Sequence, residues 1–210
     1  MRLILSCLVM LTVLMGARPA AAQQLLGDTQ VPYSADRTVV TGGKTYVGRV
    51  YAMPGRQRHE QDLNGLPLVA ILRADRKVAW LELAALHVFT DFPFPAAITD
   101  YAGQQQLGAP LGTETLAGET VRKYRIERQG TDGSQVYGYL WMTDDGIVVR
   151  LEGSFVETNG RETKASYELS HIQRAPQPAA LFDLPAGMTR LPPEALAPLM
   201  GIRIKQPGQG

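Results

Sequence analysis

Apolar and polar residues alternate most regularly over residues 136–172, and this pattern predicts three successive antiparallel strands. Asp145-Gly146 suits a two-residue hairpin turn, because both central residues of that turn take positive φ. The turn would set three pairs across the hairpin, namely Met142 with Val149, Trp141 with Arg150, and Leu140 with Leu151. The hairpin then has one apolar face and one polar face.

The turn between the second and third of these strands has two possible registers. A two-residue loop at Asn159-Gly160 would place Glu157 opposite another carboxylate, Glu162. A three-residue loop with Gly160 in the left-handed conformation instead places Glu157 opposite Arg161. We therefore predict the three-residue loop, which also brings Arg150 opposite Glu168. In this register one apolar face is shared by Leu140, Met142, Val149, Leu151, Tyr167 and Leu169.

Similar patterns predict further strands on the N-terminal side. The resulting sheet would have one apolar face and one face exposed to solvent. They cover Tyr33–Thr41, Lys44–Met53, residues 56–61, residues 66–72, Val78–Leu83 and residues 119–128. We expect the polar strand at 56–61 to lie at an edge, because it follows Pro54-Gly55. Residues 66–83 are almost continuously apolar, which indicates burial on both faces or the lining of a cavity.

Residues 84–112 form the least regular part of the chain. They contain Phe89, Phe92 and Phe94, and then a helix candidate at residues 96–107, which Gly108 would end. Each aromatic side chain gains about 1.5–3 kcal/mol from burial. We therefore expect this segment to pack against the sheet or to cover an opening.

The N-terminus has the pattern of a secretory signal peptide. Arg2 precedes an apolar run at residues 3–15, and small residues follow up to Ala22, where we expect cleavage. The run is shorter than the roughly 20 residues that cross a bilayer. Cys7, the only cysteine, lies in this leader, so an exported chain would need a sizeable core in place of disulfides. We expect residues 1–22 to be the signal peptide, 23–192 one domain and 193–210 a tail.

The charge of the chain is balanced. It has 21 Lys and Arg residues, of which Arg2 and Arg18 lie in the leader, against 20 Asp and Glu residues. This balance argues against nucleic acid as a partner. Any partner is expected to be recognised by shape and apolar contact.

Few residues suggest chemistry. His59, His87 and His171 lie in different segments, without the spacing of metal ligands, so we predict no metal and no cofactor. Asp144 and Asp145 could act as an acid–base pair, but turn formation before Gly146 is the favoured interpretation. No serine stands in the strained turn that a hydrolase nucleophile requires.

The order and spacing of several short motifs resemble the periplasmic lipoprotein carrier superfamily (LolA/LolB-like), and within it a divergent outer-membrane lipoprotein-sorting-like protein. The resemblance covers residues 33–185. The motifs are Tyr33-Ser-Ala-Asp36, Tyr46-Val-Gly-Arg-Val50, Pro54-Gly-Arg-Gln-Arg58, Leu140-Trp-Met-Thr-Asp-Asp-Gly146, Tyr167-Glu-Leu169 and Leu181-Phe-Asp-Leu-Pro185. The resemblance implies a mainly β fold: a strongly curved antiparallel sheet, or half-open β-barrel, with one or two short helices covering its concave face. It also implies an apolar cavity for lipid acyl chains.

These observations favour a monomeric periplasmic protein that binds lipid or lipoprotein acyl chains without catalysis. The expected cavity residues are Leu72, Trp80, Leu83, Phe89, Phe92, Phe94, Leu140, Met142, Val149, Leu151, Tyr167 and Leu169. An alternative is an envelope interaction or stress-sensing module with a filled interior. Its partner protein would dock on Trp141 and Arg150, residue types that are enriched at binding hot spots. Packing of Trp141 against Arg150 would be the purely structural explanation. A lipid- or glycan-processing enzyme is the third possibility.

Overall fold

The described residues form one 12-stranded sheet, and within them the sheet is not closed into a barrel. The structure, a computed structural model, describes residues 29–63, 65–93, 107–129 and 133–199. The strand order is β12-β6-β5-β4-β3-β2-β1-β11-β10-β9-β8-β7. Neighbouring strands are antiparallel, except that the short β12 pairs with β6 in parallel. The mainly β, half-open fold predicted from the sequence is therefore confirmed.

The elements follow one another along the chain with short connections. The strands are β1 (Tyr33–Thr41), β2 (Lys44–Met53), β3 (Arg56–Leu63), β4 (Leu66–Arg73), β5 (Val78–Leu83), β6 (Val88–Pro93), β7 (Gly112–Leu116), β8 (Glu119–Gln129), β9 (Gln135–Met142), β10 (Val148–Val156), β11 (Glu162–Arg174) and β12 (Thr189–Arg190). The helical segments are the 3₁₀ turns η1 (Ala74–Arg76), η2 (Ala84–Leu86) and η3 (Ala179–Phe182), and the helix α3 (Pro193–Leu199).

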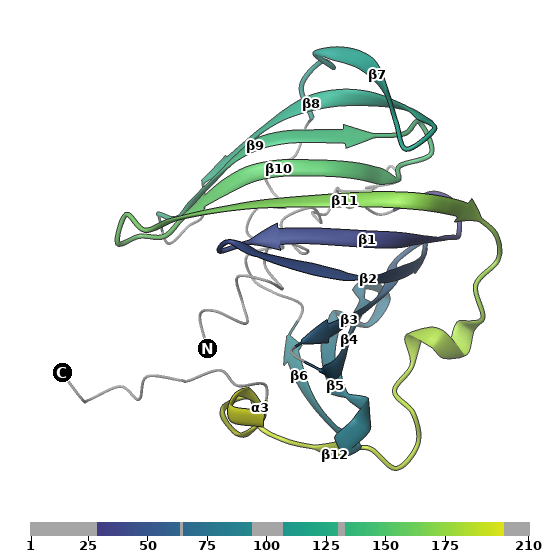
Figure 1. The fold of residues 1–210 in the computed structure, drawn as a ribbon. Helices are drawn as coiled ribbons and strands as arrows, with labels where there is room; N and C mark the ends of the chain where they lie inside the picture. Colours follow the sequence, from purple (N-terminus) through teal and green to yellow (C-terminus); the bar gives the residue numbers. More distant parts are fainter. Residues whose placement is uncertain (1–28, 64, 94–106, 130–132, 200–210) are drawn as a thin grey trace.

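The sheet is strongly bent (Figure 1). Strands β7 to β11 lie in the upper part of the view, and β3 to β6 turn across them in the lower part. Gly48 lies in β2, between the two halves. A Cβ atom on this residue would lie 1.8 Å from the carbonyl oxygen of Glu60 on β3. Only glycine allows the two backbones to approach so closely.

The turn between β9 and β10 differs from the predicted two-residue turn. The amide of Thr143 donates to the carbonyl of Ile147 at 2.9 Å, so the loop contains three residues and ends at Gly146, with φ +85°. A two-residue turn would need positive φ at Asp145 as well, and Asp145 avoids it. A bulge between Val148 and Arg150 then absorbs the extra residue.

Because of this bulge, two of the three predicted pairs form. Trp141 lies opposite Arg150 and Leu140 lies opposite Leu151, whereas Met142 pairs with Val148 in place of Val149.

The three-residue loop predicted between β10 and β11 is confirmed. The amide of Glu157 donates to the carbonyl of Arg161 at 2.9 Å, and Gly160 has φ +80°. As predicted, Arg150 lies opposite Glu168, and their side chains form an ion pair of 3.0 Å.

Two expectations about the strands need correction. Residues 56–61 belong to β3, which lies between β2 and β4 and not at an edge. The polar residues of β3 are used inside the protein, as described below. Strands β6 and β7 were not predicted, and Phe89 and Phe92 are strand residues. The helix expected at 96–107 lies outside the described residues except for Leu107. The signal peptide expected at residues 1–22 and the chain beyond Leu199 also lie outside them.

The two faces of the sheet have different functions in packing. The inner, concave face carries most of two clusters of buried apolar residues, and α3 covers part of it through Leu196, which packs with Leu81 and Leu83. On the outer face, η3 places Phe182 against Val69 and Ile71. The segment that carries η3 therefore packs against the outer face of the sheet.

Candidate functional site

An unbroken apolar row crosses the inner face of five strands. Tyr167 on β11 pairs with Val39 on one side and with Leu151 on the other, and Leu151 pairs with Leu140. Leu140 in turn pairs with Tyr124 on β8. Residues that lie opposite each other project from the same face, so the five side chains form one continuous surface. All are buried except Tyr124, which is partly buried.

Most of the predicted cavity residues lie on this face. Those in the cluster that contains the row are Leu72, Leu140, Met142, Val149, Leu151, Tyr167 and Leu169. Leu83 and Phe92 belong to the second inner cluster, under α3. These contacts agree with the predicted apolar face of the meander.

Trp80 and Phe89 point the other way. Trp80 pairs with Ile71, an outer-face residue, and packs in the outer cluster with Phe182. Phe89 pairs with Glu82, which is also on the outer face. The continuous apolarity of β4 and β5 gives no alternation from which the two faces could be told apart. Phe94 lies outside the described residues.

A polar centre lies in the middle of this apolar face. The side chain of Arg37 is only 3% exposed. Its Nη1 donates to Nδ1 of His59 at 3.2 Å, and its Nη2 donates to Oε1 of Gln61 at 2.5 Å. Arg37 on β1 pairs with Gly48 on β2, which pairs with Gln61 on β3. The guanidinium therefore reaches β3 across a strand that has no side chain at that position.

The tautomer of His59 follows from these contacts. A guanidinium can only donate, so Nδ1 of His59 accepts and the proton is on Nε2, which lies 3.0 Å from Oε1 of Gln57. Burial, and then the charge of Arg37, hold the pKa of His59 well below its ordinary value. The imidazole is therefore neutral. Burial also raises the pKa of Tyr167 to about 12, with Arg37 opposing that rise.

Acidification is expected to destabilise the protein through His59. Below the ordinary histidine pKa of about 6.5, the imidazole of His59 is protonated in the unfolded chain but stays neutral in the folded protein. The free energy of unfolding therefore falls by up to about 1.4 kcal/mol for each pH unit of acidification. Above that pH this contribution is constant. Urea denaturation at pH 7 and pH 5 should show a loss about 1–2 kcal/mol smaller in His59→Gln than in the wild type. Equal losses in the two proteins would contradict the prediction.

Sequence reasoning missed the polar centre, although a signal for it exists. Arg37 stands between Ala35 and Val39, which are apolar residues at the two neighbouring inward positions of β1. Likewise, Gln57 and His59 occupy alternate, buried positions of β3. A charged residue at an inward position is a candidate for function or for a buried network.

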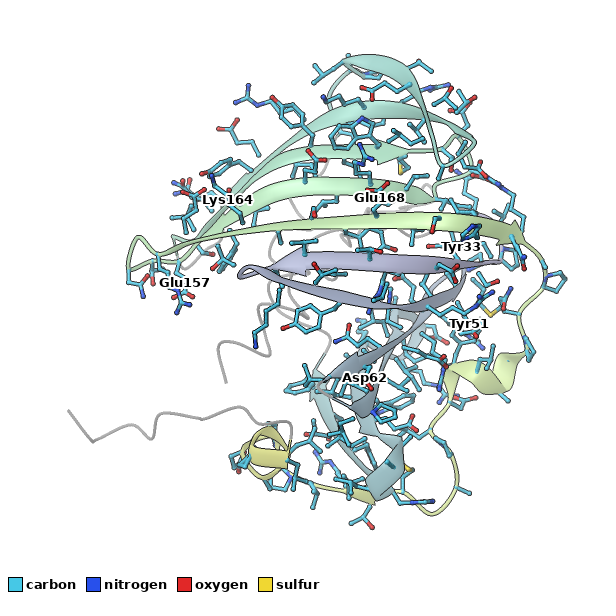
Figure 2. All side chains as sticks on the ribbon, in the orientation of Figure 1. Tyr33, Tyr51, Asp62, Glu157, Lys164 and Glu168 are labelled. Carbon is cyan, nitrogen blue, oxygen red and sulfur yellow. The ribbon has the colours of Figure 1, made fainter. Side chains whose placement is uncertain are left out.

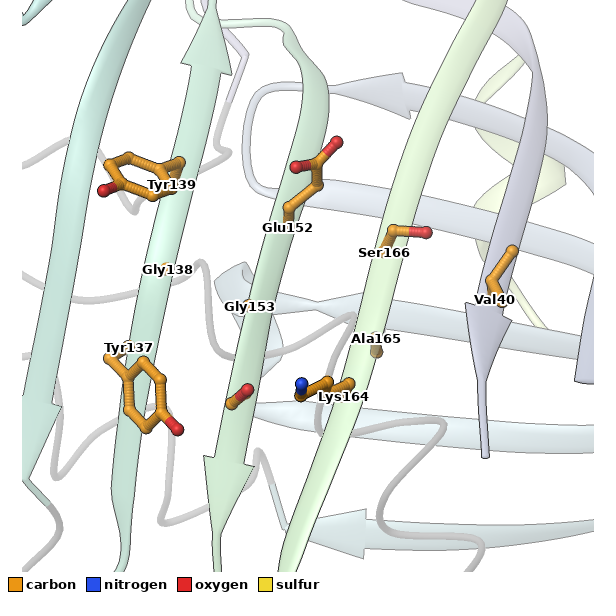
Figure 3. A pocket seen from close by; sticks show the side chains of 10 residues that line it. Val40, Tyr137, Gly138, Tyr139, Glu152, Gly153, Lys164, Ala165 and Ser166 are labelled. Carbon is orange, nitrogen blue, oxygen red and sulfur yellow. The ribbon is translucent and has the colours of Figure 1, made fainter. Parts of the chain in front are cut away.

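The outer face carries an open groove of about 440 Å³ across β9, β10, β11 and β1 (Figure 3). Its floor runs along Gly138, Gly153 and Ala165, which pair across the sheet. Tyr137 and Tyr139 of β9 stand at one end and are 41% and 40% exposed. The other lining side chains are Val40, Glu152, Ser154, Lys164 and Ser166. Lys164 and, further along β11, Glu168 can be followed in Figure 2.

Trp141 is not part of an exposed patch. It is 4% exposed, with the ammonium of Lys123 4.6 Å from its ring centroid and the guanidinium of Arg150 at 5.8 Å. The packing explanation for Trp141 is therefore the one that the structure supports. The contribution of Lys123, on the neighbouring strand β8, was not foreseen.

The candidate acid–base residues have structural partners. Asp144 pairs with Arg122 at 3.0 Å. Arg174 donates to Asp145 at 2.6 Å, and this hydrogen bond lowers the pKa of Asp145. Both aspartates lie in the three-residue loop that ends at Gly146. His171 pairs with Asp36 at the surface.

In the part of the chain that the structure describes, no group of three His, Cys, Asp or Glu side chains could hold a metal ion. No helix in the same residues has the length and apolarity to cross a membrane.

Comparison with known proteins gives similarity in structure only. No protein-family model matches the chain, and no curated protein matches it. An uncharacterized conserved protein from Thermus thermophilus has a similar structure, with a TM-score of 0.50, 16% identity, and coverage of 77% of this chain and 90% of that one.

Other similar structures include a LolA superfamily protein from Nitrosomonas europaea, with a TM-score of 0.40, 11% identity, and coverage of 73% of this chain and 90% of that one. The Pseudomonas aeruginosa MucA/MucB complex matches with a TM-score of 0.48 and 13% identity, over 76% of this chain and 58% of the matched chain. The similarity to the Thermus thermophilus protein is one of fold alone.

Proposed function

We propose that this protein binds lipid or lipoprotein acyl chains in the periplasm, on the concave face of its sheet, and that it does so without catalysis. The observation that carries the proposal is the row of aliphatic and tyrosine side chains from Tyr124 to Val39, which continues across five strands without a charged side chain. A flexible apolar chain needs such a surface and few directed polar contacts. The secretory leader expected at residues 1–22 supports the periplasmic location.

The energetics of such binding are favourable. Each methylene group that leaves water gains about 0.8 kcal/mol, so a long acyl chain can offset the cost of displacing the atoms that now cover the face. Leu140 and Leu151 are almost wholly excluded from water. A guest that replaces their present neighbours must therefore be apolar as well.

Two adjacent residues of β1 allow a direct test. Val39 lies on the inner face and is buried, whereas Val40 lies on the outer face and is exposed. Val39→Gln should weaken the binding of a neutral fluorescent apolar probe by about tenfold, because the ligand would then desolvate an amide. Val40→Gln should leave the affinity unchanged. Probe titration measures both, with far-UV circular dichroism as the check that each variant folds.

Native mass spectrometry of the purified protein supplies a second readout. Lipid that co-purifies with the wild type and is reduced in Val39→Gln supports the proposal. Absence of co-purified lipid, together with no probe binding by the wild type, would exclude it.

The outer groove favours a second candidate, an envelope protein–protein interaction module. Tyr137 and Tyr139 are large, exposed and adjacent to the groove, and tyrosine is enriched at interface hot spots. Pull-down from crosslinked envelopes should then recover a protein partner with the wild type and lose it with Tyr139→Ala. If the protein only binds lipid, the two should recover the same proteins.

A further inference from the structure

The outer groove carries opposite charges on its two walls. Of the residues that line it, Glu152 on β10 and Lys164 on β11 are the charged ones. Glu152 pairs across the sheet with Ser166, and Lys164 pairs with Ser154, so the two charges are diagonal neighbours on the outer face. Such neighbours lie about 7–8 Å apart. The groove therefore presents one negative and one positive charge at a fixed spacing.

Both charges are accessible to a ligand. The side chain of Glu152 is 52% exposed, and its contact with Arg150 is a loose one of 3.9 Å, while Arg150 pairs with Glu168 at 3.0 Å. Lys164 is also exposed, and its charge acts on Glu162 of the same strand. Exposed pairs of this kind contribute little to stability. A ligand of complementary charge can therefore contact both residues without breaking a strong ion pair.

The two tyrosines at one end of the groove are already held in place. The hydroxyl of Tyr137 donates to Oε1 of Glu162 at 2.9 Å, and Ser154 donates to the same atom at 2.6 Å. The ammonium of Lys123, on β8, lies 4.6 Å from the ring centroid of Tyr139. Both rings are nevertheless exposed, and Figure 3 shows them on either side of Gly138. Side chains that are held in this way lose little conformational freedom when a ligand binds.

The tyrosine end of the groove suits a cation. Glu152 lies opposite Tyr139, and the faces of aromatic rings attract ammonium and guanidinium groups. The hydroxyl of Tyr137 uses its proton on Glu162, so it can only accept a hydrogen bond from a ligand. Hydrogen bonds, first from Ser154 and then from Tyr137, lower the pKa of Glu162, so this neighbouring carboxylate is also ionised.

An extended peptide matches this arrangement of charges. In an extended chain, residues i and i+2 point to the same side and lie about 6.6–6.8 Å apart, close to the spacing of Glu152 and Lys164. A lysine or arginine of the peptide that contacts Glu152 also places its charge beside the two tyrosine rings. An acidic residue two positions along the peptide then reaches Lys164. The charges of the groove and of such a peptide are therefore complementary.

We propose that the outer groove binds an extended segment of a partner protein with the pattern basic-X-acidic. The basic side chain contacts Glu152, Tyr137 and Tyr139, and the acidic side chain contacts Lys164. This inference rests on the second candidate under Proposed function, since it names the segment that the partner protein presents to the groove.

Four short peptides test the pattern on the wild-type protein at low ionic strength, where exposed charges are least screened. The matching peptide is acetyl-Ser-Lys-Thr-Glu-Ser-amide. A control of the same composition, acetyl-Ser-Lys-Glu-Thr-Ser-amide, directs its two charges to opposite sides of the extended chain. Two further controls carry Lys-Thr-Lys or Glu-Thr-Glu at the centre. NMR titration of isotope-labelled protein, followed at the amides of Gly138 and Gly153, should show that the matching peptide binds about fivefold more tightly than each control.

Reversal of one charge in the groove should change the preferred peptide. In Glu152→Lys the preference is expected to move to the Glu-Thr-Glu peptide, which should bind about fivefold more tightly than it binds to the wild type. Glu114→Lys is the control, because Glu114 is an exposed strand glutamate on β7, at the end of the sheet. It should keep the wild-type preference. A purely structural role of Glu152 would weaken all four peptides alike and would create no new preference.

The outcomes separate this pattern from the interaction function on which it rests. Equal binding of the two peptides of the same composition, or binding of no peptide, would overturn the pattern. The interaction function would then stand if pull-down still recovered a partner that depends on Tyr139, and it would fail if no such partner appeared. Chitotriose, a neutral oligosaccharide, is the comparison for a glycan ligand. If it shifts the same amides and no peptide does, the groove binds glycans and the peptide is excluded. The wild-type titrations decide the question even if Glu152→Lys does not fold.

Discussion

Gly48→Ala is expected to lower the free energy of unfolding by about 4 kcal/mol or more, or to prevent folding altogether. The added methyl group would lie 1.8 Å from the carbonyl oxygen of Glu60 and 2.9 Å from its carbonyl carbon. Both atoms belong to the backbone of β3, so no side-chain rotation can relieve the clash. Strands β2 and β3 would have to separate, and the hydrogen bond from Arg37 to Gln61 would be lost with them.

Chemical denaturation followed by circular dichroism measures this effect. Gly112→Ala is the control, since Gly112 is also a strand glycine but has open space where its Cβ would be. It should change the free energy of unfolding by about 0.5 kcal/mol or less. A Gly48→Ala protein as stable as the Gly112→Ala protein would show that the close approach of β2 and β3 is not required.

Strands with strict alternation of apolar and polar residues could be predicted from the sequence. The length of a loop could also be predicted where one of two registers would place like charges opposite each other. The loop at Gly160 is an example, because only one register removes the opposition of Glu157 and Glu162. The turn that ends at Gly146 was predicted to contain two residues, but it contains three. A bulge between Val148 and Arg150 restores the predicted pairing beyond the turn. The position of such a bulge cannot be read from the hydrophobic pattern of the sequence.

The residues of the candidate site could be assigned to a face of the sheet only in strands where apolar and polar residues alternate. Leu140 and Leu151 were assigned to the correct face, whereas Trp80 lies in an apolar run that offers no contrast between faces. The polar residues of β3 were predicted to form an edge strand, because a single sequence does not show that Arg37 will contact His59 across an intervening strand. That meeting depends on the pairing of β1, β2 and β3, which is a property of the whole sheet.

Arg73→Met is expected to lower the free energy of unfolding by about 2–3 kcal/mol and to release the segment that carries η3. Arg73 is 1% exposed and donates two hydrogen bonds of 2.8 Å to Asp75. Its Nη1 also donates to the carbonyl of Phe182 at 2.9 Å and to Asp183 at 2.5 Å. Breaking a fully buried pair costs about 3–5 kcal/mol, and the partly exposed aspartates reduce that cost because water can solvate them again.

The dependence of the free energy of unfolding on pH below neutrality provides a second, independent test of Arg73→Met. The hydrogen bond from Arg73 is the main reason why the pKa of Asp75 is lowered. The interaction of Asp75 with Arg73 therefore stabilises the folded protein fully above the ordinary aspartate pKa. This stabilisation is lost as the pH falls through the lowered pKa that Asp75 has in the folded state. The variant should lose less stability than the wild type when acidified below about pH 4.

Arg76→Met provides the matched comparison, because Arg76 pairs with Asp183 at 3.1 Å but is itself exposed. Exposed pairs contribute little, so this variant should stay within about 0.5 kcal/mol of the wild type. Limited proteolysis of the same three proteins should cut the segment around residues 175–188 faster only in Arg73→Met. If both arginine variants were equally stable and equally resistant, the buried guanidinium would not be what holds η3 on the outer face.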